Sequence, residues 1–402
     1  MDRVHPMTGA LTGIKVLDLS IIVQGPQAAA LLHDLGAEVI KIELPGVGDL
    51  ARWIPCGPDD PRPPLFVACN RGKRSATLDL RTEGGRRAFL RLVERSDVVV
   101  SNFQPGTLEQ WDLGFDHLRT VNPSIILAAG SALGPIGPDA HREGADGVAQ
   151  AAGGLISTTG VDGGEVTMIG AAVADHIGSL NMVTGVLAAL HHRFRTGEGQ
   201  LVETSLLGGQ IWAQASEYTH FLLTGSSAGR ANRGHPLVKS LYRMFATADG
   251  DIVLTGVPLP RWAEFCAAVE RSDWAEDPRY AVATPTPPDL EFLKDQLAEV
   301  FKARTTADWT ERLKPTGARF GPVNSYADVV ADRQVWDNGY LTEALDPNGR
   351  SVRVVGNPIR FSASPMRTSA VVAELGQHTE EVLLEAGFDW DDIANLREMG
   401  AF

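Results

Sequence analysis

The sequence predicts an α/β fold with a mostly parallel sheet in a large domain, joined to a smaller α+β domain. In the first third of the chain, short apolar runs alternate with helical patterns. Beyond residue 245 this alternation stops, and a stretch rich in Gly and Ser at 224–236 separates the two regions. The 402 residues, of which 44% are hydrophobic, are enough for about two to three domains with their own cores.

The elements of the large domain follow from where apolar residues run unbroken and where they recur at helical spacing. Strands are expected at 14–19, 38–43, 75–80, 97–101 and 124–129. Helices are expected at 27–35, 82–94 and 106–121. Strands that alternate with helices form βαβ units, so this domain should be Rossmann-like and bind ligands beyond the carboxyl ends of its strands. Those ends are the loops at 20–25, 43–48, 102–103 and 130–134.

The first turn of this domain disfavours two common ligand classes. It reads S-I-I-V-Q-G-P and has one glycine, whereas a dinucleotide-binding turn has the pattern G-x-G-x-x-G. No P-loop pattern occurs anywhere in the chain. The sequence therefore argues against a nicotinamide-dependent or an ATP-dependent enzyme.

The most strongly helical segment begins near Asp175 and ends at Gly197 and Gly199. Its large apolar residues recur at steps of three or four and should form one apolar stripe: Ile177, Leu180, Val183, Leu187, Leu190 and Phe194.

Two roles are open to Asp175 at the start of this helix. As an N-cap, its carboxylate would accept a hydrogen bond from a free backbone N–H. As a nucleophile, it would be kept ionised by the helix N-terminus, and small neighbours such as Gly170, Ala174 and Gly178 would leave room for a substrate carbonyl. The adjacent His176 points about 100° away on a helix, so we expect it to be structural.

The second half of the chain predicts the smaller domain. A helical pattern continues from residue 206 to 223, and the linker after it contains Gly225 to Gly229, a formal match to the G-x-S-x-G of serine hydrolases. We reject that match because a nucleophile elbow follows a strand, and this one follows a helix. A hairpin signal at 245–256 and helices at 260–270 and 290–302 predict an α+β domain that ends near residue 322, and a last helix is expected at 379–386.

Composition limits the partners of the protein. A net charge of −14 and a pI near 5.2 argue against nucleic acid or an anionic membrane as the main partner. The three cysteines are widely spaced and odd in number, and none of the ten histidines lies in a metal-binding pattern, so neither disulfides nor a bound metal is expected. No signal-peptide core precedes the first strand, and we expect a cytoplasmic protein.

A basic cluster of Arg71, Lys73 and Arg74 stands in a glycine-containing loop just before the third expected strand. It could be an exposed, solvated turn, or it could hold the phosphate of a ligand. The residues alone do not decide between the two.

Several long segments, in this order, resemble the class III coenzyme A-transferases, a family that includes formyl-CoA:oxalate and carnitine CoA-transferases and the α-methylacyl-CoA racemases. They are V-L-D-L-S…G-P…L-L-H-D-L-G-A-E-V-I-K-I-E (16–43), N-R-G-K-R-S-A-T-L-D-L (70–80), S-N-F-Q-P-G (101–106), A-D-G-V-A-Q-A-A-G-G (145–154), G-A-A-V-A-D (170–175), R-T-G-E-G-Q-L-V-E (195–203) and L-G-Q-H-T-E-E-V-L (375–383). The resemblance covers nearly the whole chain, so it is far more specific than any single short motif.

The resemblance implies a domain organisation and an assembly. The large domain would span 1–224, the small domain 225–328, and the remainder, 329–402, would be a linker and a segment that returns to the large domain. Family members form homodimers of two interlocked rings, and the stretches at about 205–230 and 322–345 would be the crossing connections here.

The resemblance also implies an activity, with Asp175 as the nucleophile. No cofactor would be bound permanently, because the coenzyme A thioester is a substrate and the second substrate is a carboxylic acid. Residues expected to bind coenzyme A are Val23, Gln24, Lys41, Arg71, Lys73, Arg74, Asn102, Phe103 and Arg142. Candidates for the substrate pocket are Ala145, Asp146, Gly234 and His235.

Two alternatives are weaker. A 2-methylacyl-CoA racemase needs a base on each face of the α-carbon, and Ala145 stands where the racemases of the family have their histidine. A silent CoA-binding subunit that pairs with an active homologue would not need Asp175. Among the transferases, oxalate is doubtful, because the stretch A-N-R-G-H-P-L-V-K-S lacks the glycine run of the oxalate-specific members.

Overall fold

The computed structural model describes residues 9–58, 62–280, 287–346 and 348–402. The chain forms two compact units: the first contains Met1–Gly153, Gly170–Ala213 and Arg333–Phe402, and the second contains Gly154–Ile169 and Gln214–Asp332. The boundaries expected from the sequence place residues 154–169 in the large domain. In the structure, the N–H groups of Ala231 and Asn232 donate to the carbonyls of Thr158 and Gly160, which ties this segment to the second unit.

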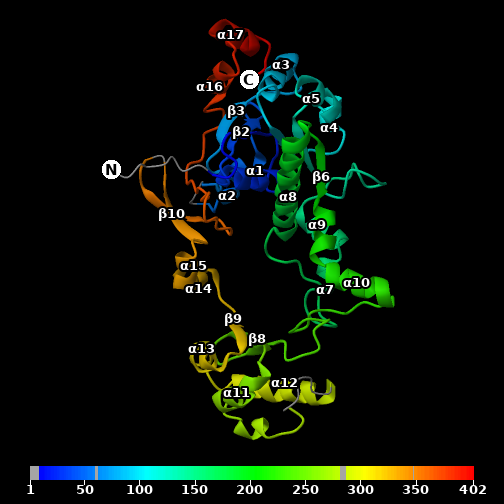
Figure 1. The fold of residues 1–402 in the computed structure, drawn as a ribbon, viewed down its shortest axis with the longest axis vertical. Coiled ribbons are helices and arrows are strands. Elements are labelled where there is room, and N and C mark those ends of the chain that lie inside the picture. Colours follow the sequence, from blue (N-terminus) through cyan, green and yellow to red (C-terminus); the bar gives the residue numbers. More distant parts are fainter. Residues whose placement is uncertain (1–8, 59–61, 281–286, 347) are drawn as a thin grey trace. The chain divides into compact units, whose positions relative to one another are not determined.

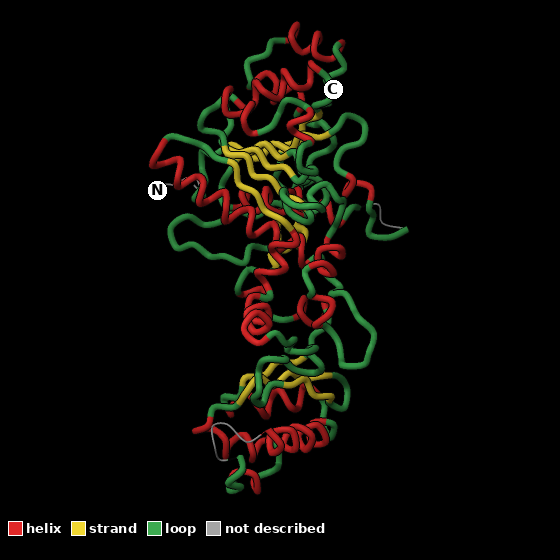
Figure 2. Tube along the Cα trace, turned by 90° about the vertical axis from the view of Figure 1, so that its right-hand side faces the viewer, coloured by secondary structure: helices red, strands yellow, loops and turns green. Residues whose placement is uncertain are grey.

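A six-stranded parallel sheet forms the centre of the first unit (Figure 2). Its strands, in spatial order, are β3 (Arg74–Thr77), β2 (Glu38–Glu43), β1 (Lys15–Asp18), β4 (Val98–Ser101), β5 (Ile126–Ser131) and β6 (Leu201–Ser205). Strands β1 to β3 are added toward one edge of the sheet and β4 to β6 toward the other, so the strand order reverses between β1 and β4. This is the order of a Rossmann-like fold. The first five strands were expected from the sequence, and β6 was not.

Helices of the first unit lie on both sides of this sheet (Figure 1). Their bounds are α1 (Gln24–Asp34), α2 (Pro64–Asn70), α3 (Glu83–Val93), α4 (Thr107–Gln110), α5 (Phe115–Val121), α6 (Asp146–Ala152), α8 (Val173–Thr196), α9 (Leu206–Ala213), α15 (Arg333–Asp337), α16 (Thr379–Glu385) and α17 (Trp390–Glu398), with a 3₁₀ turn at Leu50–Trp53 and a hairpin of β10 (Leu341–Leu345) and β11 (Ser351–Val355).

Alternate residues of each strand supply two separate cores. One set, which includes Leu17 and Ile40, packs against α3, α5, α16 and α17. The other set, which includes Val16 and Val98, packs under α1 and α8. This alternation follows from the period of two along a strand.

The buried face of α8 differs from the expected apolar stripe. The helix buries small or flexible residues instead, among them Ala174, Gly178, Met182, Val186 and Ala189. Of the expected stripe, Val183 is buried and Leu190 packs on the core, but Leu180, Leu187 and Phe194 are 51%, 40% and 88% exposed, so the stripe faces the core only in part. The physical reason is close packing: α8 lies directly against α1, whose facing residues include Ala28 and Ala29, and large side chains would hold the two helices apart. α8 is also the one described helix that is long and apolar enough to cross a membrane by length and composition.

Three expected helices have different bounds. The pattern at 106–121 forms two helices, because Asp112 adopts a left-handed conformation with φ 54° between them. The pattern at 206–223 is divided at Gln214, which is not helical. The helix expected at 379–386 is not the last, because Asp389 caps α17 with a capping box.

The second unit contains a three-stranded antiparallel sheet of β7 (Arg243–Ala246), β8 (Asp251–Gly256) and β9 (Arg319–Pro322). The hairpin expected at 245–256 is present as β7 and β8. The helices of the second unit are α7 (Leu155–Thr158), α10 (Ala215–Thr224), α11 (Trp262–Ala268), α12 (Pro287–Phe301), α13 (Thr306–Leu313) and α14 (Tyr326–Ala331), with 3₁₀ turns at Leu259–Arg261, Ser272–Ala275 and Lys314–Thr316. Aromatic residues such as Phe245, Phe301 and Trp309 fill the core of this unit.

Candidate functional site

Asp175 is the third residue of α8 and does not cap the helix. The N-cap position is Ala172, which makes no side-chain cap. The cap comes from α6: one oxygen of Asp146, Oδ1, lies 2.6 Å from the N–H nitrogen of Ala174 and 3.3 Å from that of Asp175. Capping is therefore carried out by another carboxylate, and the Asp175 side chain is left for a different role.

The environment of Asp175 raises the pKa of its carboxyl group to about 6. Burial is the largest cause, and the negative charge of Asp146 adds to it, whereas the backbone N–H of Gln24 acts in the opposite direction. The helix terminus does not keep the pKa low, as the sequence suggested, because burial outweighs it. The group is still mostly ionised at neutral pH.

The carboxamide of Gln24 is the most unusual polar group near Asp175. Gln24 begins α1 and is 3% exposed, and its Nε2 has no hydrogen-bond partner among the residues that the structure describes. Its position depends on two glycines, because a Cβ atom at Gly130 would come within 2.5 Å of Oε1, and one at Gly178 within 2.9 Å of Nε2. The Ser179 hydroxyl lies 2.7 Å from the Gln24 carbonyl and 2.8 Å from that of Asp175, which links α1 to α8.

The loop between β1 and α1 is held in a strained conformation. Ile22 has φ 68°, which a β-branched residue rarely adopts. Asn102 accepts the N–H of Ile21 and donates to its carbonyl, both at 2.8 Å, and Asp49 accepts the N–H of Ile22 at 3.0 Å. Strain of this kind persists where the surroundings fix it, and here it sets where Gln24 begins its helix.

Four buried charged side chains pack next to this loop: Asp18, Lys41, Asp49 and Lys73. Lys73 Nζ lies 2.7 Å from Asp18, and Lys41 Nζ lies 3.0 Å from Asp49 and donates to the Ser20 carbonyl at 2.8 Å. Burial acts to lower the pKa of Lys41, but the surrounding carboxylates outweigh it and raise that pKa. Burial lowers the pKa of Lys73 to about 8. Two carboxylates thus balance two ammonium groups in the interior.

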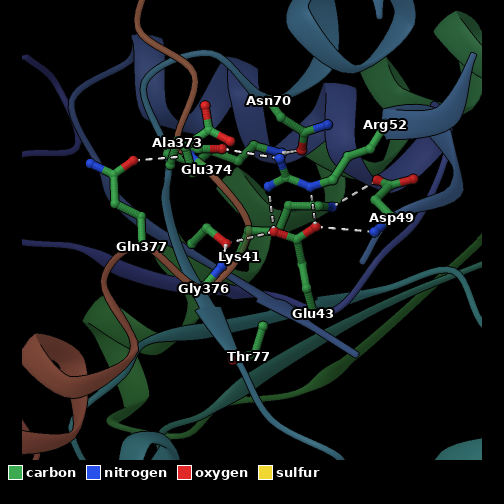
Figure 3. Close-up of polar contacts among 12 residues, drawn as sticks. Lys41, Glu43, Asp49, Arg52, Asn70, Thr77, Ala373, Glu374, Gly376 and Gln377 are labelled. Atoms are coloured by element: carbon green, nitrogen blue, oxygen red, sulfur yellow. Dashed lines mark hydrogen bonds and ion pairs between the residues drawn. The ribbon is translucent and has the colours of Figure 1, made fainter. Parts of the chain in front are cut away.

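A second buried network joins the C-terminal segment to the end of β2 (Figure 3). Arg52 forms a bidentate pair with Glu43 at 2.8 and 2.7 Å and donates to the Ala373 carbonyl at 3.1 Å. Ser75 donates to Glu43 at 2.7 Å and accepts the N–H of Gly376 at 2.9 Å. The segment around 373–377 therefore fixes the same strand end that carries Lys41.

A cavity of about 300 Å³ lies beyond the carboxyl ends of β1, β2 and β4. Its lining includes residues of three of the four loops that the sequence singled out, but none of the loop at 130–134. The lining residues are Leu19–Ile21, Lys41–Leu44, Val47–Leu50, Leu78–Arg81, Phe103 and Trp111. Phe103 and Trp111 meet edge to face with ring centroids 5.5 Å apart. The position, next to the reversal of strand order, is where ligands bind in sheets of this type.

The expected cationic ligands of coenzyme A are engaged in ion pairs. Arg71 forms a bidentate pair with Asp34 at 2.8 and 2.7 Å, and both it and Lys73 are buried, so the alternative of an exposed, solvated turn is wrong for these two side chains. Arg74 pairs with Glu38, Glu381 and Glu385. Arg142 is exposed and lies 3.4 Å from Asp139. Their role in binding coenzyme A stays a prediction.

The remaining candidates divide between the two units. Val23, Gln24, Ala145 and Asp146 lie in the first unit with Asp175, and Ala145 is the N-cap residue of α6. Gly234 and His235 lie in the second unit, where His235 Nε2 is 3.3 Å from Glu217.

Sequence reasoning missed most of the residues that fix the loop, namely Asp18, Asp49, Glu43 and Arg52. A signal was present, because Lys41 and Glu43 interrupt the apolar strand E-V-I-K-I-E and Asp18 ends the strand K-V-L-D. Charged residues inside a central parallel strand are expected to be paired.

The whole chain is similar in sequence and fold to known proteins. The family model described as CoA-transferase family III matches residues 11–379. A succinyl-CoA:mesaconate CoA-transferase of Haloarcula hispanica is 36% identical over 94% of this chain and 97% of its own length. A succinyl-CoA:glutarate CoA-transferase of Mus musculus is 32% identical over 93% and 86%. A solved structure of a CAIB/BAIF family protein from Brucella suis has a TM-score of 0.83 and 33% identity, and covers 94% of this chain and 100% of that one.

Proposed function

We propose that this chain, which belongs to CoA-transferase family III, moves coenzyme A from an acyl-CoA donor to a carboxylic acid through covalent intermediates on Asp175. One observation carries the assignment to Asp175. The Asp175 carboxylate is partly buried. Asp146 caps α8 in its place, and a hydrogen bond from the backbone N–H of Gln24 stabilises the ionised form of Asp175. A carboxylate in that state is a competent nucleophile.

The proposed reaction proceeds in four acyl transfers. The Asp175 carboxylate attacks the thioester carbonyl, the C–S bond breaks, and a mixed anhydride and CoA thiolate form. The thiolate attacks the aspartyl carbonyl of the anhydride and releases the donor acid, leaving an aspartyl-CoA thioester. The acceptor carboxylate attacks this thioester and again forms an anhydride and thiolate. Thiolate attack on the acceptor carbonyl gives the new acyl-CoA and free Asp175.

Gln24 is the proposed hydrogen-bond donor to the oxyanions of these steps. Its side-chain N–H group has no partner among the described residues, and leaving such a donor unpaired is costly in a buried site. A developing oxyanion would satisfy it, and the interaction would be stronger in the transition state than in the ground state. The buried position would also limit the access of water to the anhydride.

Coenzyme A is proposed to enter the cavity beyond β1, β2 and β4. The loops that line it include the one that ends at Gln24, so a ligand there would approach the start of α1. The buried lysines Lys41 and Lys73 are proposed to act mainly by holding the loop, since carboxylates already neutralise their charges.

The proposed acceptor is a dicarboxylic acid longer than oxalate. Two relatives are named for transfer to mesaconate and to glutarate, which supports this class. The absence of a glycine run at 231–240 argues in the same direction. The racemase alternative gains no support, because Ala145 offers no base and Asp146 is used in capping α8.

A homodimer is proposed as the working form, in the cytoplasm. Support comes from large apolar side chains that are exposed in the first unit: Leu180, Leu187 and Phe194 of α8, and Ile211 and Trp212 of α9. Exposed apolar side chains that gather in one patch commonly mark contacts with another chain. Sedimentation of a monomer at low concentration would contradict the assembly.

The experiment that tests the mechanism traps the covalent intermediate. Wild-type protein given succinyl-CoA without an acceptor should accumulate a species that hydroxylamine or borohydride converts to a stable adduct on the peptide containing Asp175. Mass spectrometry of the digest locates it. A label on another residue, such as Glu143 or Asp146, would contradict the proposal.

A further inference from the structure

A second cavity, of about 680 Å³, lies within the second unit, and every residue that lines it belongs to that unit. Its walls come from the segment 237–241, from the end of β8 and the residues that follow it, and from α12. Most of the lining side chains are apolar, and three of them, Trp262, Tyr280 and Leu293, also belong to the core of the unit. The core therefore holds an apolar wall in place, which suits the hydrocarbon part of a ligand.

Two charged side chains line this cavity among the residues that the structure describes, and both are cations: Lys239 and Arg319. Both side chains are exposed, and neither makes a hydrogen bond or an ion pair with a described residue. No carboxylate of the described residues lines the cavity. The charge of these two groups is therefore available to an anion.

These two side chains are exceptions among the cations of the second unit. Each of the other lysines and arginines of this unit pairs with a carboxylate, apart from Arg230, which donates to backbone carbonyls. Such pairing is expected in a chain with 50 acidic and 36 basic residues, because carboxylates are in excess. Two cations that stay unpaired and line the same cavity indicate a site for an anion from outside the chain.

The guanidinium group of Arg319 lies against the backbone of Gly256. A Cβ atom at Gly256 would come within 2.5 Å of Nη2 of Arg319. The two residues face each other across β8 and β9, where the register of the strands shifts, and both line the cavity. The missing side chain of Gly256 therefore gives the guanidinium group its place at the cavity wall.

From these observations we infer that the cavity lined by Lys239 and Arg319 binds a carboxylic acid with an apolar body. The carboxylate contacts the two cations, and the hydrocarbon part lies against the apolar wall. A short polar acid gains the ionic contacts alone, and an alcohol of the same length gains the apolar contacts alone. This site goes beyond the proposed transfer, because its residues all belong to the second unit and binding there involves no covalent step at Asp175.

Titration calorimetry of the full chain with octanoate tests the site without turnover. The double variant Lys239→Gln with Arg319→Gln should raise the Kd about a hundredfold, because two charge-assisted contacts of about tenfold each are lost. Lys239→Arg keeps the charge and should bind close to wild type. An equal Kd for the double variant and wild type, or no binding of octanoate by wild type, would overturn the inference.

Two controls separate lost binding from lost structure. Lys302→Gln is the matched change, because Lys302 is an exposed lysine of α12 that pairs with Glu299 and does not line the cavity, so its Kd should equal that of wild type. The urea midpoint of the double variant should also equal that of wild type, since both altered side chains are exposed and unpaired. Should the double variant unfold, Lys239→Gln alone carries the test, with an expected increase in Kd of about tenfold.

The chemistry of the ligand is tested by changing one of its parts at a time. Octan-1-ol lacks the charge and should bind at least about tenfold more weakly than octanoate, and each methylene removed from octanoate should weaken binding about fourfold. Equal affinity for octanol and octanoate, or an affinity independent of chain length, would overturn the inference. Binding of octyl phosphate without binding of octanoate would likewise contradict the carboxylate assignment. No acyl-CoA is present in these titrations, so a failure of transfer at Asp175 leaves their outcome unchanged.

Discussion

The two units of this protein use charge in opposite ways. In the first unit, Lys41 and Lys73 are buried and neutralised by Asp18 and Asp49, and their task is to hold a strained loop. In the second unit, Lys239 is exposed to a cavity and has no carboxylate partner among the described residues. The same residue type is structural where its charge is balanced and available for a ligand where it is not. We therefore expect changes at the buried charges of the first unit to affect stability, and a change at Lys239 to leave stability nearly unchanged.

The largest effect is expected for Asp175→Asn. The amide has no nucleophilic oxygen anion, so kcat should fall by roughly a thousandfold or more. Retained transfer would contradict the assignment of Asp175 as the nucleophile.

The same variant should be at least as stable as wild type at neutral pH. Because the pKa of Asp175 is raised from 3.8 to about 6, the folded state holds a proton that the unfolded state has lost between these values. The contribution of this group to stability is therefore lost as pH rises through that window. Urea unfolding at pH 7.5 checks this: a lower midpoint for Asp175→Asn would show that the carboxylate stabilises the fold.

The next effect concerns the buried charges of the first unit. Lys73→Met removes the ammonium group nearest Asp18 and leaves a buried carboxylate with Lys41 at 3.7 Å as its remaining ion-pair partner. We expect a loss of about 3 kcal/mol in the free energy of unfolding, because half of a buried pair is removed. Urea denaturation followed by circular dichroism measures it. If the only change were a higher KM for acyl-CoA, Lys73 would be a ligand contact rather than a support.

A smaller effect separates the two roles of Asp146. Asp146→Asn keeps an oxygen that can cap α8 but removes the charge that raises the pKa of Asp175. The acid limb of kcat/KM, expected near pH 6 in wild type, should therefore move to lower pH with little change in stability. Asp146→Ala removes the cap as well and should cost about 1 kcal/mol of stability. An acid limb that stays at the wild-type pH in Asp146→Asn would exclude the electrostatic role.

The smallest effect is expected for Arg142→Ala. Its side chain is exposed and its contact with Asp139 is long, so stability should change by less than about 0.5 kcal/mol. KM for acyl-CoA is the sharper measurement. An increase would support the expected contact with coenzyme A, and no change would leave Arg142 as a surface residue.

The sequence by itself determined the alternation of strands and helices. Apolar runs at 38–43 and 97–101, separated by helical patterns, favour a parallel sheet with helices on both faces, and the strands at these positions pair in parallel with β1. It also indicated Asp175 as the candidate nucleophile, because an acid at the start of a long helix within family motifs is a local signal.

The tertiary structure alone decided what each charged side chain does. The three cations within 71–74 were compatible with a surface turn or a phosphate site, yet Arg71 pairs with Asp34 and Lys73 with Asp18, which lie 37 and 55 positions away in the chain. The face of α8 that is buried was likewise set by its close contact with α1, which favours small residues over the large apolar stripe. Local spacing encodes the period of an element, but the partner of a charge and the direction of a helix face depend on residues distant in sequence, so only the folded chain specifies them.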